Sequence, residues 1–155
     1  MKKSIWIFQT GEPLPFENKY RGMRLSNLYN KAKKMGEDVL VISTNFNHTE
    51  KKFREENNSF LPFILKKDIV LIKSIGYKKN ISLLRILDHT ILALNLFLFL
   101  ILSKKYFNKP AISFIGFPPI EWAFVAAVWS KFNKVKTIID IKDLWPEIFY
   151  ENKKF

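Results

Sequence analysis

The residues best suited to chemistry stand at the end of the predicted last strand. Asp140 and Asp143 lie three residues apart, and Leu-Trp-Pro-Glu follows, ending at Glu147. The apolar residues before Asp140 indicate a buried strand, and ligands of open α/β sheets bind outside the carboxyl ends of the strands. The pattern therefore favours a site here. An Asp after a strand is also a common helix N-cap, and a Trp-Pro pair also serves packing alone, so both alternatives stay open.

Further polar candidates follow two earlier predicted strands. Gly11 and Glu12 come after Ile5–Phe8, and His48 ends the loop after Val39–Ser43. A glycine in that place permits close approach of a ligand to the backbone, or simply allows the chain to turn. The full Gly-x-Gly-x-x-Gly fingerprint of dinucleotide sites is absent, which argues against a nicotinamide-dependent dehydrogenase.

Two arginines stand at the start of the predicted helix Arg24–Met35, which Gly36 ends as its C′ residue. Positive charge is unfavourable at a helix N-terminus. Arg21 and Arg24 in that place hint at an anionic ligand, and a solvated surface arginine is the alternative.

A long helix, Leu83–Leu102, is predicted with Ser82 as its N-cap. Its apolar run Ile91–Leu102 falls short of the roughly 20 residues needed to cross a bilayer. We therefore expect a buried core helix, with a membrane-interface role as the alternative. His89 within this helix is expected to be a core or edge histidine rather than a ligand.

The other predicted elements complete an alternation of strands and helices. They are the strands Leu61–Leu65, Ile69–Ile72, Ala111–Ile115 and Lys134–Ile141 and the buried helix Ile120–Trp129. Such alternation indicates an α/β fold with a Rossmann-like parallel sheet and helices on both faces. The length of 155 residues suits one domain, residues 1–155.

Composition narrows the function classes. Hydrophobic residues make up 48% of the chain, there is no cysteine and there are two histidines. Thiolate and histidine-rich metal sites are thus excluded. The net charge of +12 favours polyanions, anionic lipid or phosphorylated ligands, but no nucleic-acid recognition motif accompanies the scattered lysine pairs. No signal peptide is evident, so we expect a cytoplasmic protein or one bound to the cytoplasmic face of the inner membrane.

Several of these segments, taken in order, carry a resemblance. They are Thr10-Gly11-Glu12-Pro13-Leu14-Pro15, Arg21 to Arg24, Thr44-Asn45-Phe46-Asn47-His48 with Lys51 and Arg54, and Asp140 to Glu147. In this order they resemble the N-terminal domain of family 4 glycosyltransferases that build O-antigen, capsule or exopolysaccharide. The block Asp143-Leu144-Trp145-Pro146-Glu147 is the most specific part. Gly36-Glu37 departs from the Gly-His of most members.

The resemblance implies the N-terminal half of a GT-B fold, in which two Rossmann-like domains face each other across a cleft. Such enzymes transfer a sugar from a nucleotide-diphosphate sugar with retention of configuration and without a bound metal or other cofactor. This half would hold the acceptor, often a lipid-linked sugar, and the missing C-terminal domain would hold the donor. The chain would then be a truncated product, a split subunit or a pseudogene remnant, inactive by itself.

The resemblance also implies roles for individual residues. Asp143 and His48 would be the catalytic candidates, orienting the acceptor hydroxyl or taking its proton. Gly11, Glu12 and Glu147 would border the acceptor side of the cleft, and Arg21 and Arg24 could meet acceptor phosphate. The alternative from another class is a non-catalytic basic α/β module that docks on an anionic membrane or a partner subunit.

Overall fold

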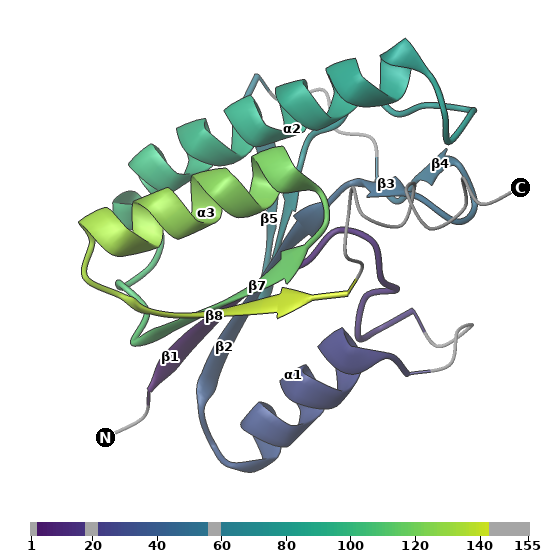
Figure 1. Ribbon diagram of the computed structural model, residues 1–155. Helices are drawn as coiled ribbons and strands as arrows, with labels where there is room; N and C mark the ends of the chain where they lie inside the picture. Colours follow the sequence, from purple (N-terminus) through teal and green to yellow (C-terminus); the bar gives the residue numbers. More distant parts are fainter. Residues whose placement is uncertain (1–2, 18–21, 56–59, 143–155) are drawn as a thin grey trace, which may run out of the picture.

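A six-stranded sheet forms the centre of the protein in a computed structural model that describes residues 3–17, 22–55 and 60–142 (Figure 1). The strand order is β5-β6-β2-β1-β7-β8. The strands of this sheet are β1 (Ser4–Phe8), β2 (Asp38–Thr44), β5 (Phe63–Lys66), β6 (Ile69–Ile72), β7 (Ile112–Phe117) and β8 (Lys136–Ile141). The helices are α1 (Arg24–Lys34), α2 (Leu83–Leu102), the short 3₁₀ helix η1 (Ser103–Lys105) and α3 (Ile120–Phe132), and a small hairpin joins β3 (Phe46–Asn47) to β4 (Lys52–Phe53).

The predicted α/β class is confirmed, with one correction to the all-parallel sheet. Strands β6, β2, β1, β7 and β8 run parallel, whereas β5 pairs with β6 in the antiparallel sense. Only Lys67 and Asp68 separate β5 from β6. A connection that short can close a hairpin, but a parallel pair needs a crossover of a dozen or more residues.

The helices cover both faces of the sheet because the chain reverses its direction of travel across it. From β1 the chain moves outward through α1 to β2, and from β7 it moves the opposite way through α3 to β8. Right-handed crossovers in opposite directions place their helices on opposite faces. Figure 1 shows α1 on one side of the sheet and α2 with α3 on the other. This arrangement is compatible with a Rossmann-like fold.

Local signals set the ends of two helices as predicted. The Ser82 hydroxyl accepts a hydrogen bond from the Arg85 backbone N–H at 3.2 Å, which caps α2. Gly36 has φ of +78° and its N–H donates to the Lys33 carbonyl at 3.0 Å. A left-handed residue in that place favours glycine, so α1 ends there.

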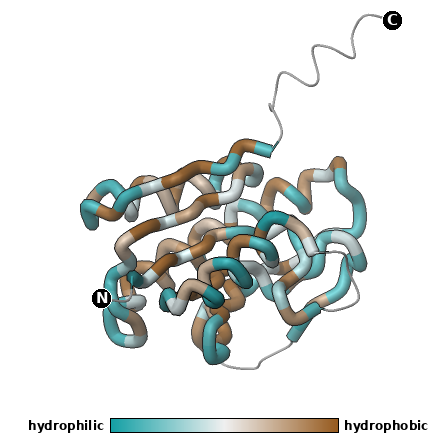
Figure 2. Tube along the Cα trace, turned by 90° about the horizontal axis from the view of Figure 1, so that it is seen from below, coloured by the Kyte–Doolittle hydropathy of each residue, from teal (hydrophilic) through white to brown (hydrophobic). Residues whose placement is uncertain are grey.

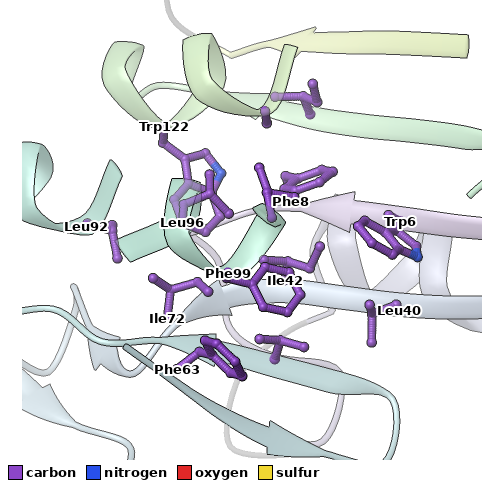
Figure 3. Packing of buried hydrophobic residues seen from close by; sticks show 14 of the residues in the cluster. Trp6, Phe8, Leu40, Ile42, Phe63, Ile72, Leu92, Leu96, Phe99 and Trp122 are labelled. Atoms are coloured by element: carbon purple, nitrogen blue, oxygen red, sulfur yellow. The ribbon is translucent and has the colours of Figure 1, made fainter. Parts of the chain in front are cut away.

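The larger core lies between the sheet and the α2–α3 layer (Figure 3). Phe99 is fully buried on α2, and its ring meets the Phe63 ring edge to face at 5.1 Å. Trp6 of β1 stacks on Trp129 of α3 with ring centroids 5.1 Å apart. Figure 2 shows hydrophobic residues along the strands and hydrophilic ones in many connecting turns. These aromatic contacts fix where α2 and α3 sit on the sheet.

A second, aliphatic core lies on the other face, beneath α1. Leu25 and Ala32 of α1 pack against the sheet residues Ile7, Val39 and Val41. These helix residues lie seven apart, one face of an amphipathic helix. The predicted helix Arg24–Met35 is therefore confirmed to within one residue.

Three segments expected to be buried are only partly so. Helix α2 buries Leu96 and Phe99 but leaves Leu94 and Phe97 about half exposed. Helix α3 leaves Phe124 66% exposed. Strand β8 lies at the sheet edge, with the apolar side chains Ile138, Ile139 and Ile141 at least half exposed. An apolar run does not reveal which of its faces the fold covers, and this is why the prediction went wrong.

By length and composition alone, helix α2 also meets the criteria for a membrane span. Leu83–Lys105 is the single stretch in the described ranges that is long and apolar enough to cross a bilayer. The core helix of a soluble protein can meet the same criteria. In this fold α2 packs its buried face on the sheet and on α3.

A matched pair on α2 tests this one-sided packing. Phe99→Ala should lower the free energy of unfolding by about 3–5 kcal/mol, because it empties a fully buried ring site. Phe97→Ala, at a 51% exposed ring two residues away, should lower it by less than about 1.5 kcal/mol. Urea unfolding followed by circular dichroism measures both, and equal losses would contradict the packing described.

Candidate functional site

A polar cavity of about 270 Å³ opens at the carboxyl ends of the central strands. Residues 9–12 after β1 and Pro118 with Pro119 after β7 form two of its walls. Thr44, His48 and Tyr77 form a third, and one face of α2 closes it. Since the chain turns outward in opposite directions from β1 and β7, the two following loops diverge and leave a crevice, the usual place for ligands in open α/β sheets.

A glycine on β7 makes room for one wall of this cavity. Gln9 follows β1, and its side chain lies where a Cβ on Gly116 would be, 1.5 Å from the Gln9 Oε1 atom. Gln9 is 3% exposed. Any larger residue at position 116 would displace Gln9, so Gly116 lets this amide line the cavity.

Gly11 lines the cavity. A Cβ built on Gly11 would meet no atom within 4 Å, and its φ is outside the left-handed region. The described fold therefore does not require glycine here for a turn, and the cavity is open beside the Gly11 backbone.

Glu12 lines the cavity, but both of its carboxylate oxygens have partners. Oε2 accepts the Leu25 backbone N–H at 2.7 Å, and Oε1 is paired with the Lys142 ammonium group. Met23, the N-cap residue of α1, offers no side-chain bond. The Glu12 carboxylate thus caps α1 and ties it to the end of β8, which positions the cavity wall and leaves no free oxygen for catalysis.

Arg54 joins the loops after β1 and β2. Its guanidinium group donates to the Phe46 carbonyl at 2.7 Å, the Thr44 carbonyl at 3.1 Å and the Glu17 carboxylate at 2.8 Å. Hydrogen bonds from a charged group are stronger than neutral ones. Arg54 therefore fixes the rim on which His48 stands.

His48 is brought into the cavity beside groups that define its tautomer. Its Nδ1 atom is hydrogen-bonded to the Tyr77 hydroxyl and lies 3.3 Å from the Lys51 ammonium nitrogen. A lysine ammonium group can only donate. Nδ1 is thus the acceptor, and the neutral ring carries its proton on Nε2. Within the described residues Nε2 has no hydrogen-bond partner, so it can donate to a ligand oxygen.

Three polar residues of α2 form the cavity wall opposite the loops. Arg85, Asp88 and His89 follow one another at spacings of three and one residue, which places them on one face of the helix. The Asp88 carboxylate accepts the backbone N–H groups of Ile75 at 3.0 Å and Gly76 at 2.8 Å, and the Ser74 hydroxyl donates to it as well. Asp88 therefore holds the turn before Tyr77 in place.

Both histidines are neutral at physiological pH. Burial lowers the pKa of His48, and the nearby Lys51 and Arg85 charges lower it further. Burial also lowers the pKa of His89, with Arg85 acting in the same direction and Glu121 and Asp88 opposing it. Arg85 Nε lies 3.5 Å from His89 Nε2. The cavity thus presents neutral imidazoles beside the Arg85 guanidinium group and the hydrogen-bonded Glu12 and Asp88 carboxylates, a set that can orient hydroxyl groups.

The structure brings together only some of the predicted site residues. Gly11, Glu12 and His48 line the polar cavity. Arg24 does not; its guanidinium group binds the Asp140 carboxylate at 2.6 Å on the surface. The other Asp140 oxygen, Oδ2, is buried and has no hydrogen-bond partner among the described residues. The predictions for Arg21, Asp143 and Glu147 lie outside the described residues.

Sequence reasoning missed Tyr77, Arg85 and Asp88, and it treated His89 as a core or edge histidine rather than a ligand. A signal was available in α2. Between Leu83 and Leu102 the charged and histidine side chains are Arg85, Asp88 and His89 alone, and all share one helical face. A polar stripe on an otherwise apolar helix indicates that this face of the helix is in contact with water. Tyr77 had no comparable signal, since the hairpin carrying His48 brings the two together.

The cavity residues form no obvious metal site. The described part of the chain holds no group of three or more histidine and carboxylate side chains placed to bind a metal ion.

Comparison with protein-family models, with curated proteins and with solved structures gives no match for this chain.

The lowered histidine pKa values predict a titration. Both rings should titrate below the ordinary value of about 6.5. Lys51→Met should raise the pKa of His48 and leave that of His89 unchanged, because Lys51 acts on His48 alone of the two. Two-dimensional NMR of the ring protons measures both.

The same shifts have a sign for stability. Between the lowered pKa values and about 6.5, the unfolded chain binds more protons than the folded one. The free energy of unfolding should therefore fall as the pH falls through that window. A histidine that titrates above about 6.5 would contradict the burial described.

Proposed function

We propose that this chain is the acceptor-binding half of a retaining, nucleotide-sugar-dependent glycosyltransferase of GT-B architecture, acting in cell-surface polysaccharide biosynthesis. The observation that carries the proposal is the polar cavity at the reversal of strand order, walled by Thr10, Gly11 and His48. These three belong to two of the segments on which the resemblance rests.

In this proposal the chain's own side chains bind and orient the acceptor. The His48 Nε2–H group donates a hydrogen bond to an oxygen of the acceptor sugar. Tyr77 and Lys51 donate to Nδ1 and so keep the ring proton on Nε2. Arg85 attracts an acceptor phosphate. Proton removal from the acceptor hydroxyl falls to a group other than His48 in this tautomer, and Asp143 with Glu147 remain the candidates that the resemblance supplies.

In the proposed GT-B architecture, a second domain binds the nucleotide-diphosphate sugar and presents it to the polar cavity across a cleft. Holding two reactants in the reacting orientation lowers the free-energy barrier by several kcal/mol. The proposal assigns this chain no metal, no resident cofactor and no nucleic-acid partner, and places it at the cytoplasmic face of the inner membrane.

Binding of sugar phosphates tests the acceptor site. N-acetylglucosamine, glucose and galactose 1-phosphates are compared with inorganic phosphate by isothermal titration calorimetry. At least one should bind more tightly than phosphate, and His48→Gln should weaken it by about threefold to tenfold, the value of one hydrogen bond. Arg24→Gln, outside the cavity, is the control and should change nothing.

Two outcomes would contradict the acceptor assignment. One is that inorganic phosphate binds as tightly as every sugar phosphate. The other is that His48→Gln and Arg24→Gln have equal effects, since only His48 lines the cavity.

A second candidate function is a non-catalytic basic module that docks on an anionic membrane or on a partner subunit. The observation that favours it is the apolar face that α2 turns away from the core, with Leu87, Leu94, Phe97 and Ile101 each more than half exposed. Lys104 and Lys105 lie exposed at the end of this face. The net charge of +12 would add attraction to anionic lipid.

Vesicle flotation tests this candidate. The chain should float with vesicles that contain phosphatidylglycerol, less with phosphatidylcholine alone, and less at high salt because salt screens the attraction. Phe97→Asp should reduce flotation several-fold, whereas Met35→Asp, on the opposite side of the sheet and 68% exposed, should not. Absence of binding at low salt would exclude a membrane role.

A further inference from the structure

Strand β8 forms one edge of the main sheet, and its outer side has no partner strand among the described residues. The strand is six residues long and contains no proline. Its apolar side chains are largely uncovered: Ile138 is 53% exposed, Ile139 50% and Ile141 58%. An apolar edge with unpaired backbone groups is a template on which another strand can pair.

The hydrogen bonds between β7 and β8 show which backbone groups point outward. Lys142, directly after β8, donates its N–H to the Phe117 carbonyl of β7 at 3.1 Å. Backbone groups of successive residues in a strand point to alternate sides, so the even-numbered residues of β8 bond to β7. The N–H and C=O groups of Thr137, Ile139 and Ile141 therefore point away from the sheet.

Two opposite charges lie symmetrically about the middle of this edge. Lys136 stands two residues before Ile138, and Asp140 stands two residues after it. All three side chains lie on the α1 face of the sheet, because Asp140 binds Arg24 of α1 at 2.6 Å and side chains alternate along a strand. Lys136 is exposed and has no ion-pair partner in the described ranges. The edge is therefore complementary in charge to a copy of itself turned by 180°.

One antiparallel register brings both pairs of opposite charges together. With Ile138 opposite Ile138 of a second copy, Lys136 of each chain lies opposite Asp140 of the other. Outward-pointing residues must face each other, so the register can change only in steps that keep this match. The next register in one direction places Lys136 opposite Lys142, and the next in the other direction places it opposite Ile138.

We infer that β8 pairs antiparallel with β8 of a second copy of this chain, which joins the two main sheets into one continuous sheet. The twofold axis passes beside Ile138, whose two copies pack on each other on the α1 face. Thr137 of each chain exchanges backbone hydrogen bonds with Ile139 of the other. A twofold interface uses the same patch on both chains, as this register requires. The inference goes beyond the sugar-binding proposal and does not depend on it.

The size of the interface decides how to detect the dimer. Each copy contributes one strand of six residues, and interfaces at the low end of the size range belong to transient complexes. We therefore expect a dimer in exchange with the monomer. Because the chain has no cysteine, a single introduced cysteine can trap the dimer as a disulfide and report which residues lie opposite each other.

Oxidation of two single-cysteine variants of the full chain tests the register. Ile138→Cys and Ile139→Cys are a matched pair, because the two side chains are 53% and 50% exposed. The two copies of residue 138 form a non-hydrogen-bonded pair with Cα atoms about 4.5 Å apart, within reach of a disulfide. The two copies of residue 139 are diagonal neighbours about 7–8 Å apart, beyond that reach. Ile138→Cys should therefore form the disulfide dimer about tenfold faster, as measured by non-reducing electrophoresis.

Charge reversal in the Ile138→Cys background tests the ion pairs. Lys136→Glu places like charges opposite each other at Asp140 and should slow cross-linking about fivefold or more. Lys67→Glu makes the same change in net charge at the opposite edge of the sheet, between β5 and β6, and should slow it less than about twofold. Thermal unfolding followed by circular dichroism checks that the variants are equally folded.

Each outcome bears on the inference. Equal cross-linking at positions 138 and 139 would overturn it in favour of random collision. Cross-linking at neither position would also overturn it and would assign the edge to another occupant, either a segment of this chain beyond Lys142 or a different protein. Equal slowing by Lys136→Glu and Lys67→Glu would overturn the charge-paired register. None of these results changes the outcome of the sugar phosphate titrations.

Discussion

The reversal of chain direction between β1 and β7 is the constraint on which the rest depends. Strands β1 and β7 are hydrogen-bonded neighbours, yet the chain leaves them toward opposite edges of the sheet. Right-handed crossovers then force α1 and α3 onto opposite faces, and the loops that begin these crossovers diverge. The polar cavity is the space between them, held open by Gly116, which leaves room for Gln9, and by the Glu12 carboxylate, which ties α1 to the end of β8.

Helix α2 contributes side chains to both the core and the polar cavity, so its sequence combines apolar and polar faces. Phe99 and Leu96 pack on the sheet, while Arg85, Asp88 and His89 face the polar cavity from the same helix. Asn95, the one polar interruption of its apolar second half, donates to the Lys73 carbonyl at 2.8 Å at the end of β6. Asp88 and Asn95 thus bond backbone groups of the segment that follows β6.

Hydrophobic periodicity and turn residues were enough to predict the long helices and the strands of the main sheet, since Ser82, Gly36 and the strand runs act locally. The β3–β4 hairpin was not predicted. The antiparallel pairing of β5 could also have been predicted, because the few residues between the two predicted strands are too short for a parallel crossover. The site was not. His48 meets Tyr77 only through the β3–β4 hairpin and the turn that Asp88 holds, and no local pattern records contacts between residues 29 positions apart. The ion pair of Arg24 was hidden from the sequence for the same reason, because its partner Asp140 is 116 residues away.

The remaining question is why so much apolar surface is exposed beside so much positive charge. Packing of the core requires only one apolar face of α2. Leu94, Phe97 and Ile101 lie on the face that does not pack in the core. Surface leucines scattered singly need no explanation, whereas a contiguous group does. The group begins at Ile86, near the start of α2, and its neighbour Arg85 lines the polar cavity. The uncovered aliphatic side chains and the charged wall of the polar cavity therefore adjoin on one helix, so whatever covers the first lies beside the second.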